Sequence, residues 1–418
     1  MRLPRPSFLR FTLAVLIAAS AILLLFVGVN TWVNPLWVSN APWTNNDFAE
    51  YRPIYRYQRT GKAGIAVSKP WKVAFFGSSR IDIAFDPALP QWQGTPAVNL
   101  AVSAGTLPET APILHYTLEH APLETAIVGI DIGDLMGGNS PYKTTGFLES
   151  PFNPDGNRLE QTLRYYAGIS TFEASVQTII NKRKNRLPEY TPQGHRLRHQ
   201  ETVDVAKVIQ RDAISHALRV IRRRKAHLPT EPNPGKKEKL QQILDDTKAH
   251  KCRLVLVIPP SHATYLGVFY QQGDPDPTFS KDRMAMAKMV AESNATHPEA
   301  PPATIWDFND FHTLNAEKVP MDNSKMHWWL DGTHARKALG DVMLARIMGW
   351  PVEAAGADFG FELNEANAAA RSEALHAGYE KFQKEQHELW KWMEQGILKY
   401  QDTAGKSSEK DEAAPGFE

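Results

Sequence analysis

The sequence predicts an α/β protein that is built on a mainly parallel sheet and preceded by one transmembrane helix. Short apolar runs have the length and composition of buried strands at residues 73–77, 97–101, 126–131, 253–258 and 303–308. Helical patterns separate these runs near residues 108–120, 236–250, 280–294 and 335–348. Strands that alternate with helices imply a parallel sheet covered on both faces, which is the three-layer flavodoxin-like arrangement.

The first element is an apolar run of 19 uncharged residues, 11–29. This length is sufficient to cross ~30 Å of hydrocarbon as a helix. Three arginines, Arg2, Arg5 and Arg10, precede the run. By the positive-inside rule, the short segment before the apolar run lies in the cytoplasm and everything after Asn30 lies outside it.

A cleaved signal peptide is the alternative interpretation of this run. The apolar part of a signal peptide is shorter and ends at small residues. Here the small residues 18–21 are followed by six further apolar residues, 22–27, which favours an uncleaved anchor. Trp32, Trp37 and Trp43 come next, as amphipathic rings do at a membrane interface.

The composition indicates one compact domain with additions. The chain has 418 residues, which exceeds the ~100 to 200 of a usual domain. Its 47 basic and 46 acidic residues leave a net charge of +1, so no electrostatic argument for nucleic acid exists. Cys252 is the only cysteine, which excludes an intramolecular disulfide and a zinc site of several thiolates. We expect it to pack inside a strand.

We expect four parts along the chain: the anchor at 1–30, a connector at 31–70, a catalytic domain at 71–350 with an insertion at 136–235, and a tail at 351–418. Residues 44–69 mix tyrosines and arginines, and we interpret them as a solvated connector with amphipathic packing rather than a surface that stacks on sugars or bases. The tail is predicted to form an amphipathic helix at 362–401 that docks on the domain or a partner, and a disordered end from Thr403.

The insertion is strongly basic. Residues 181–230 contain 13 lysines and arginines against four acids, and they include the run Arg222-Arg223-Arg224-Lys225. Such a patch could face an anionic polysaccharide, a teichoic-type phosphate or lipid headgroups. The alternative, which we prefer, is the solvated face of helices that cover the active site.

Two distant motifs supply a candidate Ser/Asp/His set. A predicted buried strand runs directly into Gly77-Ser78-Ser79-Arg80, and small-residue turns at the carboxyl ends of strands are where open α/β sheets place reactive groups. Asp331 precedes His334 by three residues at the start of a helix, where a carboxylate can hold the imidazole in one tautomer. Alternatively, Asp331 only caps that helix.

These motifs resemble those of the SGNH/GDSL hydrolase superfamily, in particular its membrane-anchored bacterial members linked to acyl modification of cell-surface polysaccharides. Gly77-Ser78-Ser79 is similar to the family's Gly-Asp-Ser block with serine in place of aspartate, and Asp331-x-x-His334 matches its Asp-x-x-His block. The family's second block resembles residues 98–105. The third, at 126–134, lacks the asparagine that binds the oxyanion in the family.

The resemblance implies a serine esterase or O-acyltransferase. Such an enzyme transfers or hydrolyses an acyl ester, and acetyl is the first choice for the acyl group. The implied catalytic residues are Ser79, Asp331 and His334. The oxyanion would be bound by backbone N–H groups of Ser79 and of Ala104 or Gly105. The implied substrate is a cell-surface or exported polysaccharide. The implied location is the bacterial inner membrane, with a periplasmic domain and a multispanning acyltransferase as a possible partner. No cofactor and no nucleic acid are expected.

Three residues are further candidates for the pocket: Arg80, Asp131 and His262. Asp131 is expected to order a loop or pair with Arg80, and His262 either to line the pocket or to cap a helix. Two other classes of function stay open. One is a catalytically silent subunit that binds polysaccharide or a membrane acyltransferase. The other is a metal-dependent hydrolase on Asp131, Asp134, His262 and His334, although these residues form no compact ligand motif.

Overall fold

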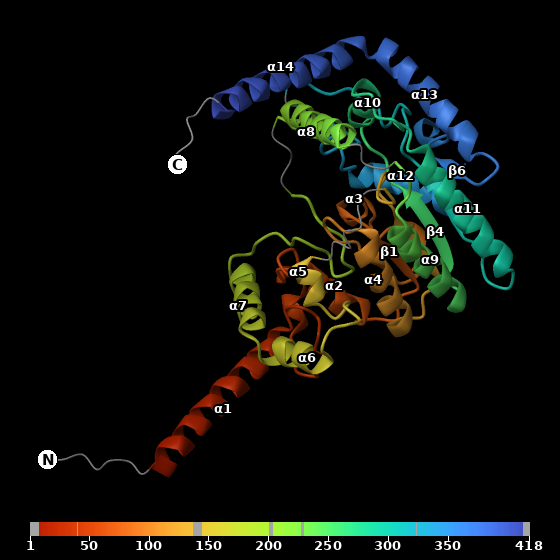
Figure 1. The fold of residues 1–418 in the computed structure, drawn as a ribbon. Helices are drawn as coiled ribbons and strands as arrows, with labels where there is room; N and C mark the ends of the chain where they lie inside the picture. Colours follow the sequence, from red (N-terminus) through yellow and green to blue (C-terminus); the bar gives the residue numbers. More distant parts are fainter. Residues whose placement is uncertain are drawn as a thin grey trace.

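The computed structural model describes residues 8–39, 41–136, 144–199, 204–226, 230–322 and 324–412. Its centre is a six-stranded sheet with the order β2-β1-β3-β4-β5-β6 (Figure 1). Five strands are parallel: β1 Val73–Phe76, β2 Ala97–Asn99, β3 Thr125–Gly129, β4 Arg253–Ile258 and β5 Thr304–Asp307. The order 2-1-3-4-5 is that of flavodoxin-like sheets. The predicted α/β class with a mainly parallel sheet is confirmed.

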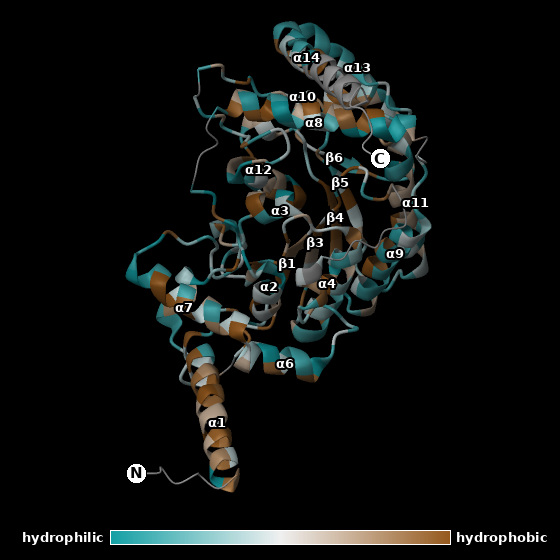
Figure 2. Cartoon of the chain, turned by 60° about the vertical axis from the view of Figure 1, so that its left-hand side comes forward, coloured by the Kyte–Doolittle hydropathy of each residue, from teal (hydrophilic) through white to brown (hydrophobic). Residues whose placement is uncertain are grey.

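Helices cover both faces of the sheet (Figure 2). On one face α4 (Leu107–His120), α9 (Pro234–Ala249) and α11 (Ser280–Thr296) pack over Ala74 and Phe76. On the other, α3 (Ser79–Ala84) and α12 (Lys337–Met348) pack over Val73 and Phe75. Because successive side chains of a strand point to opposite faces, one short apolar run supplies both cores. The remaining helices are η1 Asn46–Tyr51, α2 Gln58–Ala66, η2 Pro90–Trp92, α5 Thr145–Leu148, α6 Arg158–Ala167, α7 Ile169–Arg183, α8 Val205–Lys225, α10 Ala263–Gln271, η3 Ala354–Gly356, α13 Ala368–Glu385 and α14 His387–Glu412.

The tail differs from the single helix that the sequence predicts. Strand β6 (Phe361–Leu363) pairs antiparallel with β5, and two helices, α13 and α14, follow it with a break at Gln386. The tail is therefore part of the fold. Its backbone is helical to Glu412. Residues 413–418, which belong to the disordered end expected from Thr403, lie outside the described part.

A buried charge cluster fastens the tail to the sheet. The Nε atoms of Arg371 in α13 and of Arg283 in α11 each lie 2.9 Å from Oδ2 of Asp307, at the end of β5. Burial alone would raise the pKa of Asp307, but the two guanidinium groups lower it to about 2. The carboxylate consequently stays ionised between two cations, as a buried charge must.

Helix α1 (Phe8–Val33) projects from the domain and is apolar along its length (Figure 2). It is long and apolar enough to cross a membrane, and the same properties suit a signal sequence. Its last third packs against α6 and α7 (Figure 1). Phe26 stacks on Phe172 with ring centroids 4.4 Å apart, and the Asn30 side chain donates to the carbonyl of Tyr166 at 3.0 Å. The helix is thus continuous with the domain.

The connector is partly buried: residues 52–54, 58 and 61–66 lie in the interior, whereas Asp47, Glu50, Tyr55 and Arg56 are exposed, as amphipathic packing would give. Helix α2 places Lys62 in the interior, where its Nζ lies 2.8 Å from Oδ1 of Asp82 and 2.8 Å from the carbonyl of Asn99. The other oxygen of Asp82 accepts hydrogen bonds from Gln58 and Tyr190, both at 2.9 Å. This network joins the connector, helix α3 and the insertion.

Lys62→Met should therefore destabilise the protein strongly. The change leaves the Asp82 carboxylate buried without its cation, which typically costs ~3 to 5 kcal/mol of unfolding free energy. Urea unfolding of the full chain in detergent measures the effect. Lys69→Met, at an exposed lysine nearby, is the control and should stay within ~0.5 kcal/mol of wild type; equal losses for both variants would contradict the role of the buried pair.

Candidate active site

Ser79 lies at the carboxyl end of β1, on the first turn of α3. The chain turns at Gly77, which has a φ of +133°, and a Cβ at this position would approach the carbonyl oxygen of Gly129 to 2.8 Å. Only glycine fits there without strain. Ser78 is the N-cap of α3, and its Oγ accepts from the backbone N–H of Arg80. The sequence thus forms a tight strand-to-helix turn that presents Ser79.

A chain of hydrogen bonds joins Ser79 to residues that are 255 positions away. Ser79 Oγ lies 2.8 Å from His334 Nε2. His334 Nδ1 lies 2.8 Å from Oδ2 and 3.0 Å from Oδ1 of Asp331. Oδ1 of Asp331 also accepts the backbone N–H groups of Thr333 and His334, each at 2.8 Å. Asp331 therefore fixes the local turn and orients the imidazole at the same time, so the two interpretations of this residue do not exclude each other.

The electrostatics of Asp331 favour one arrangement of the histidine proton. Burial would raise the pKa of Asp331, but hydrogen bonds from the His334 ring and from the Thr333 and His334 backbone hold it well below the usual range. An ionised Asp331 keeps the proton of His334 on Nδ1. The lone pair of Nε2 then points at the Ser79 hydroxyl, which is the geometry that a general base requires.

The loop after β2 lies directly against the Ser79 turn. Val102 donates its N–H to the carbonyl of Gly77 at 2.9 Å, and a Cβ at Gly105 would come within 2.6 Å of the same oxygen. The N–H of Gly105 already donates to the carbonyl of Val102 at 2.9 Å, so Gly105 does not supply the oxyanion donor. In the described ranges, the N–H groups of Ser79 and Ala104 have no protein acceptor.

Asp131 and Arg80 flank the serine turn. Ser78 Oγ donates to Oδ1 of Asp131 at 3.1 Å, and Arg80 Nε lies 3.7 Å from the same oxygen. Arg80 Nη1 also donates to Ser261 Oγ at 3.0 Å. Ser78 is thereby turned toward Asp131, whereas Ser79 is turned toward His334. The expected pairing of Asp131 with Arg80 is present.

His262 does not reach the site. Its side chain has no exposed surface. Nδ1 lies 2.7 Å from Thr264 Oγ1 and Nε2 lies 2.9 Å from the carbonyl of Glu317. Burial lowers the pKa of His262 to about 4. The residue is the N-cap of α10, so the capping alternative holds and the pocket alternative does not, because both ring nitrogens are already occupied.

The metal alternative gains no support from the geometry. Burial raises the pKa of Asp134 to about 6, and its Oδ2 accepts from the N–H of Leu107 at 3.1 Å. Asp134, Asp131, His262 and His334 are not gathered around a common point; within the described ranges no three His, Cys, Asp or Glu side chains are grouped as a metal ion would require.

Sequence reasoning missed two groups of residues around the site. Asn99, from the second block, is buried and donates to the carbonyls of Ile81 and Phe85, both at 2.9 Å, so it fixes the end of α3. Helix α8 brings His216 and Arg219 into a cavity that Arg80 also lines. The sequence signal that could have identified these two residues is their spacing of three, which places both side chains on one face of a helix.

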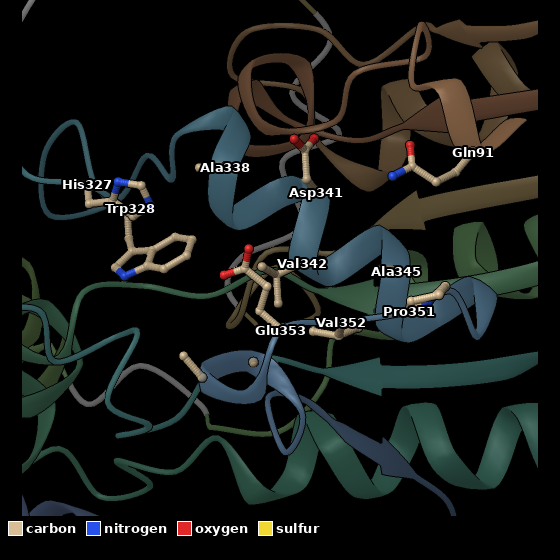
Figure 3. Close-up of a pocket in the computed structure, with 12 residues that line it drawn as sticks. Gln91, His327, Trp328, Ala338, Asp341, Val342, Ala345, Pro351, Val352 and Glu353 are labelled. Carbon is tan, nitrogen blue, oxygen red and sulfur yellow. The ribbon is translucent and has the colours of Figure 1, made fainter.

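A different cavity, of about 320 Å³, lies between α12 and residues 351–356 (Figure 3). Asp341 and Val342 of α12 line it together with Trp328 and Glu353. Neither Ser79 nor His334 is among its lining residues, so this cavity is separate from the Ser/His/Asp set.

Comparison with models of known protein families gives no match, and comparison with curated proteins gives none either. Fold and geometry define the class: an α/β protein with a mostly parallel six-stranded sheet, an N-terminal apolar helix, and a serine that is hydrogen-bonded to a histidine–aspartate pair.

Truncation of the two histidines should destabilise the fold to different extents. His262→Ala leaves the buried groups of Thr264 and Glu317 without a partner, and we expect a loss of ~1 to 3 kcal/mol of unfolding free energy. His334→Ala, at a side chain that is 24% exposed, should cost much less. Thermal and urea unfolding of the full chain check this; a larger loss for His334→Ala would contradict the assignment of His262 as a structural cap.

Proposed function

We propose that the protein is a serine-dependent enzyme that transfers or hydrolyses an acyl ester, with acetyl as the first choice, on a cell-surface or exported polysaccharide. The observation that carries the proposal is the 2.8 Å contact between Ser79 Oγ and His334 Nε2, with Asp331 behind the imidazole. A serine hydroxyl becomes nucleophilic when an adjacent base removes its proton, and this distance lies within the required ~2.6 to 3.2 Å.

The mechanism proceeds through an acyl-enzyme. His334 Nε2 takes the proton of Ser79 while Oγ attacks the ester carbonyl, and the imidazolium then gives this proton to the oxygen of the leaving group, which departs as an alcohol. The acyl group remains on Ser79 as an ester. Water or a sugar hydroxyl next attacks the acyl-enzyme, with His334 again as the base, and Ser79 recovers its proton. Asp331 stabilises the imidazolium in both halves. One intermediate therefore serves both hydrolysis and transfer.

Backbone groups are the candidate stabilisers of the oxyanion. The N–H of Ser79 is at the start of α3, where helix geometry provides no intrahelical acceptor. The N–H of Ala104 belongs to the loop packed on the Ser79 turn, in a residue with a φ of +52°. One such donor contributes ~2.7 to 4 kcal/mol to catalysis. Asp131 is unsuitable for this role because an ionised carboxylate only accepts hydrogen bonds.

The polysaccharide substrate comes from the resemblance of the serine and Asp-x-x-His motifs to SGNH/GDSL hydrolases with a membrane anchor. That resemblance also suggests a multispanning acyltransferase as a partner. On this proposal α1 is an uncleaved anchor in a bacterial inner membrane and the α/β domain lies in the periplasm. The packing of Phe26 and Asn30 on α6 and α7 supports it, because cleavage near residues 21–30 would remove these contacts.

A catalytically silent subunit that binds polysaccharide or a membrane acyltransferase is the second candidate. The feature that favours it is the oxyanion site: the family's asparagine is missing from residues 126–134, and the N–H of Gly105 is already used. Such a subunit would retain the fold and the membrane helix without turnover.

Substitutions at the serine turn should separate the two candidates. Ser79→Ala and His334→Ala should each abolish turnover of 4-nitrophenyl acetate and labelling by a fluorophosphonate probe, since members of one catalytic unit do not act additively. Asp331→Asn should reduce turnover by as much as ~10⁴-fold because the wrong tautomer results. Ser78→Ala, whose hydroxyl faces Asp131, is the matched control and should keep most of the activity.

Wild-type protein that neither reacts with the probe nor turns over the ester would support the silent subunit, especially if Ser79→Ala still allows polymer modification in cells. Greater damage from Ser78→Ala than from Ser79→Ala would show that the wrong serine has been assigned.

The topology is tested separately from the chemistry. Because Arg2, Arg5 and Arg10 precede an apolar helix that packs on the domain, we expect the intact chain in the membrane fraction. Protease added to spheroplasts should digest the domain. Protection of the domain would reverse the topology, and a mature protein that starts near residues 21–30 would identify α1 as a signal peptide.

A further inference from the structure

A cavity of about 260 Å³ lies beside Arg80, the residue after Ser79. Helices α8 and α10 pack on each other (Figure 1). Six of their residues line the cavity. Its polar lining consists of Arg80, His216, Arg219 and Arg223. Aromatic rings complete it, and no acidic residue of the described chain is among those that line it. The wall is therefore cationic and partly apolar.

The cavity adjoins the loop that holds the acid and the base. Gly332 lies between Asp331 and His334, and a Cβ placed on it would be 3.6 Å from Cβ of Asp212 in α8 and 3.8 Å from Cβ of Tyr265 in α10. Tyr265 also lines the cavity. Arg80 on one side and Gly332 on the other thus connect the cavity to both halves of the Ser/His/Asp set.

His216 is the second observation that points to a ligand. Its side chain is buried, with 6% exposed, and stacks on Tyr265 with ring centroids 3.9 Å apart. Neither ring nitrogen has a hydrogen-bond partner among the described residues. Burial, with Arg219, Arg80 and Arg223 around it, lowers the pKa of His216 to about 3. The ring is therefore neutral at pH 7 and has one N–H that no described residue accepts.

The guanidinium groups are only partly compensated by carboxylates. Arg80 is 3.7 Å from Asp131, and Arg223 is 3.5 Å from Asp274. Both contacts are longer than a good charge-assisted hydrogen bond of ~2.7 to 2.9 Å. Arg219 has no carboxylate within 4.0 Å in the described part of the chain. Arg80 also donates to Ser261 Oγ at 3.0 Å. The cavity thus has three guanidinium groups in its lining and no carboxylate among its lining residues.

A second basic cavity, of about 320 Å³, adjoins the other side of the same loop. Leu330, immediately before Asp331, lines it together with Arg196, Arg198 and Arg336. Lys337, which also lines it, is paired with Asp341 at 2.7 Å. One basic cavity thus shares Tyr265 with the surroundings of Gly332, and the other is lined by Leu330. Two such cavities near the loop of Asp331 and His334 suit an extended ligand with repeated negative groups.

We propose that the cavity beside Ser79 is an anion subsite in which Arg80, Arg219, Arg223 and His216 hold a carboxylate or phosphate group of the saccharide on which the serine acts. The guanidinium fork matches the oxygens of both anions, and a neutral imidazole adds one N–H. The inference rests on the proposed function and adds a substrate class to it: an acidic polysaccharide.

Kinetics on a charged and an uncharged form of one substrate test the subsite. The probes are acetylated oligogalacturonate and its methyl ester, which has the same chain length but no free carboxylates. Wild-type full-length protein in detergent should show a lower KM for the charged oligomer. Arg219→Gln should raise that KM by roughly tenfold or more, the usual effect of losing a hydrogen bond to a charged group. The KM values for the two probes should therefore differ less in this variant than in wild type.

Arg222→Gln is the matched control. Arg222 is exposed on the same helix, as Arg219 is, but it does not line the cavity, so both KM values should equal those of wild type. The proposal would be overturned if wild type did not discriminate between the two oligomers, or if Arg222→Gln and Arg219→Gln were equally damaging, because the effect would then reflect the general charge of the insertion.

A binding experiment keeps the subsite testable without turnover. Calorimetric titration of the full-length Ser79→Ala variant uses deacetylated oligogalacturonate and glucose 1-phosphate as separate ligands. The subsite would be supported if the protein binds one of these ligands and if Arg219→Gln weakens this binding whereas Arg222→Gln leaves it unchanged. The ligand that binds would identify the anion. Binding of neither would reject it. If wild type binds an anion in this way but turns over no ester, the subsite stands and the proposed enzymatic function fails.

Discussion

The position of Ser79 depends on the buried ion pair between Lys62 and Asp82. Asp82 is in the same short helix as Ser79, and the side chains of the pair are both completely buried at an N–O distance of 2.8 Å. A buried carboxylate requires its cation, so α3 is held in place only when α2 and the Tyr190 segment of the insertion are packed around it. The segment that follows the membrane helix is consequently a structural element of the site rather than a spacer.

The sheet and the Ser/His/Asp set could be predicted because their signals are local. Each buried strand is a continuous apolar run, and the Gly77 turn and the Asp331 turn depend on residues within three positions of each other. Because the strands are parallel, the turn after β1 and the loop after β2 meet at one edge of the sheet, where the N–H of Val102 donates to the carbonyl of Gly77. Two local motifs that are 255 positions apart come within hydrogen-bond distance through this geometry.

The features that the sequence did not predict depend on distant contacts. Strand β6 has only three residues, and it forms because β5 offers an open edge and Arg371 anchors the following helix to Asp307. A histidine after a strand looks the same whether it lines a pocket or caps a helix. His262 is a cap because its Nε2 meets the carbonyl of Glu317, 55 positions away. Similarly, the burial of Lys62 follows from partners that no local pattern reveals.

The charge of the insertion shows why a count of basic residues is a poor guide to function. The prediction of a solvated basic face holds for Arg219, Arg222 and Arg224, which are exposed, yet the same helix also places His216, Arg219 and Arg223 among the residues that line the cavity beside Arg80. Positions 216, 219 and 223 are separated by three and four residues, so they share one face of α8. A net charge of +1 for the whole chain conceals this local concentration. The spacing on the helix, together with the burial of an unpaired histidine, distinguishes the lining of a cavity from a solvated surface.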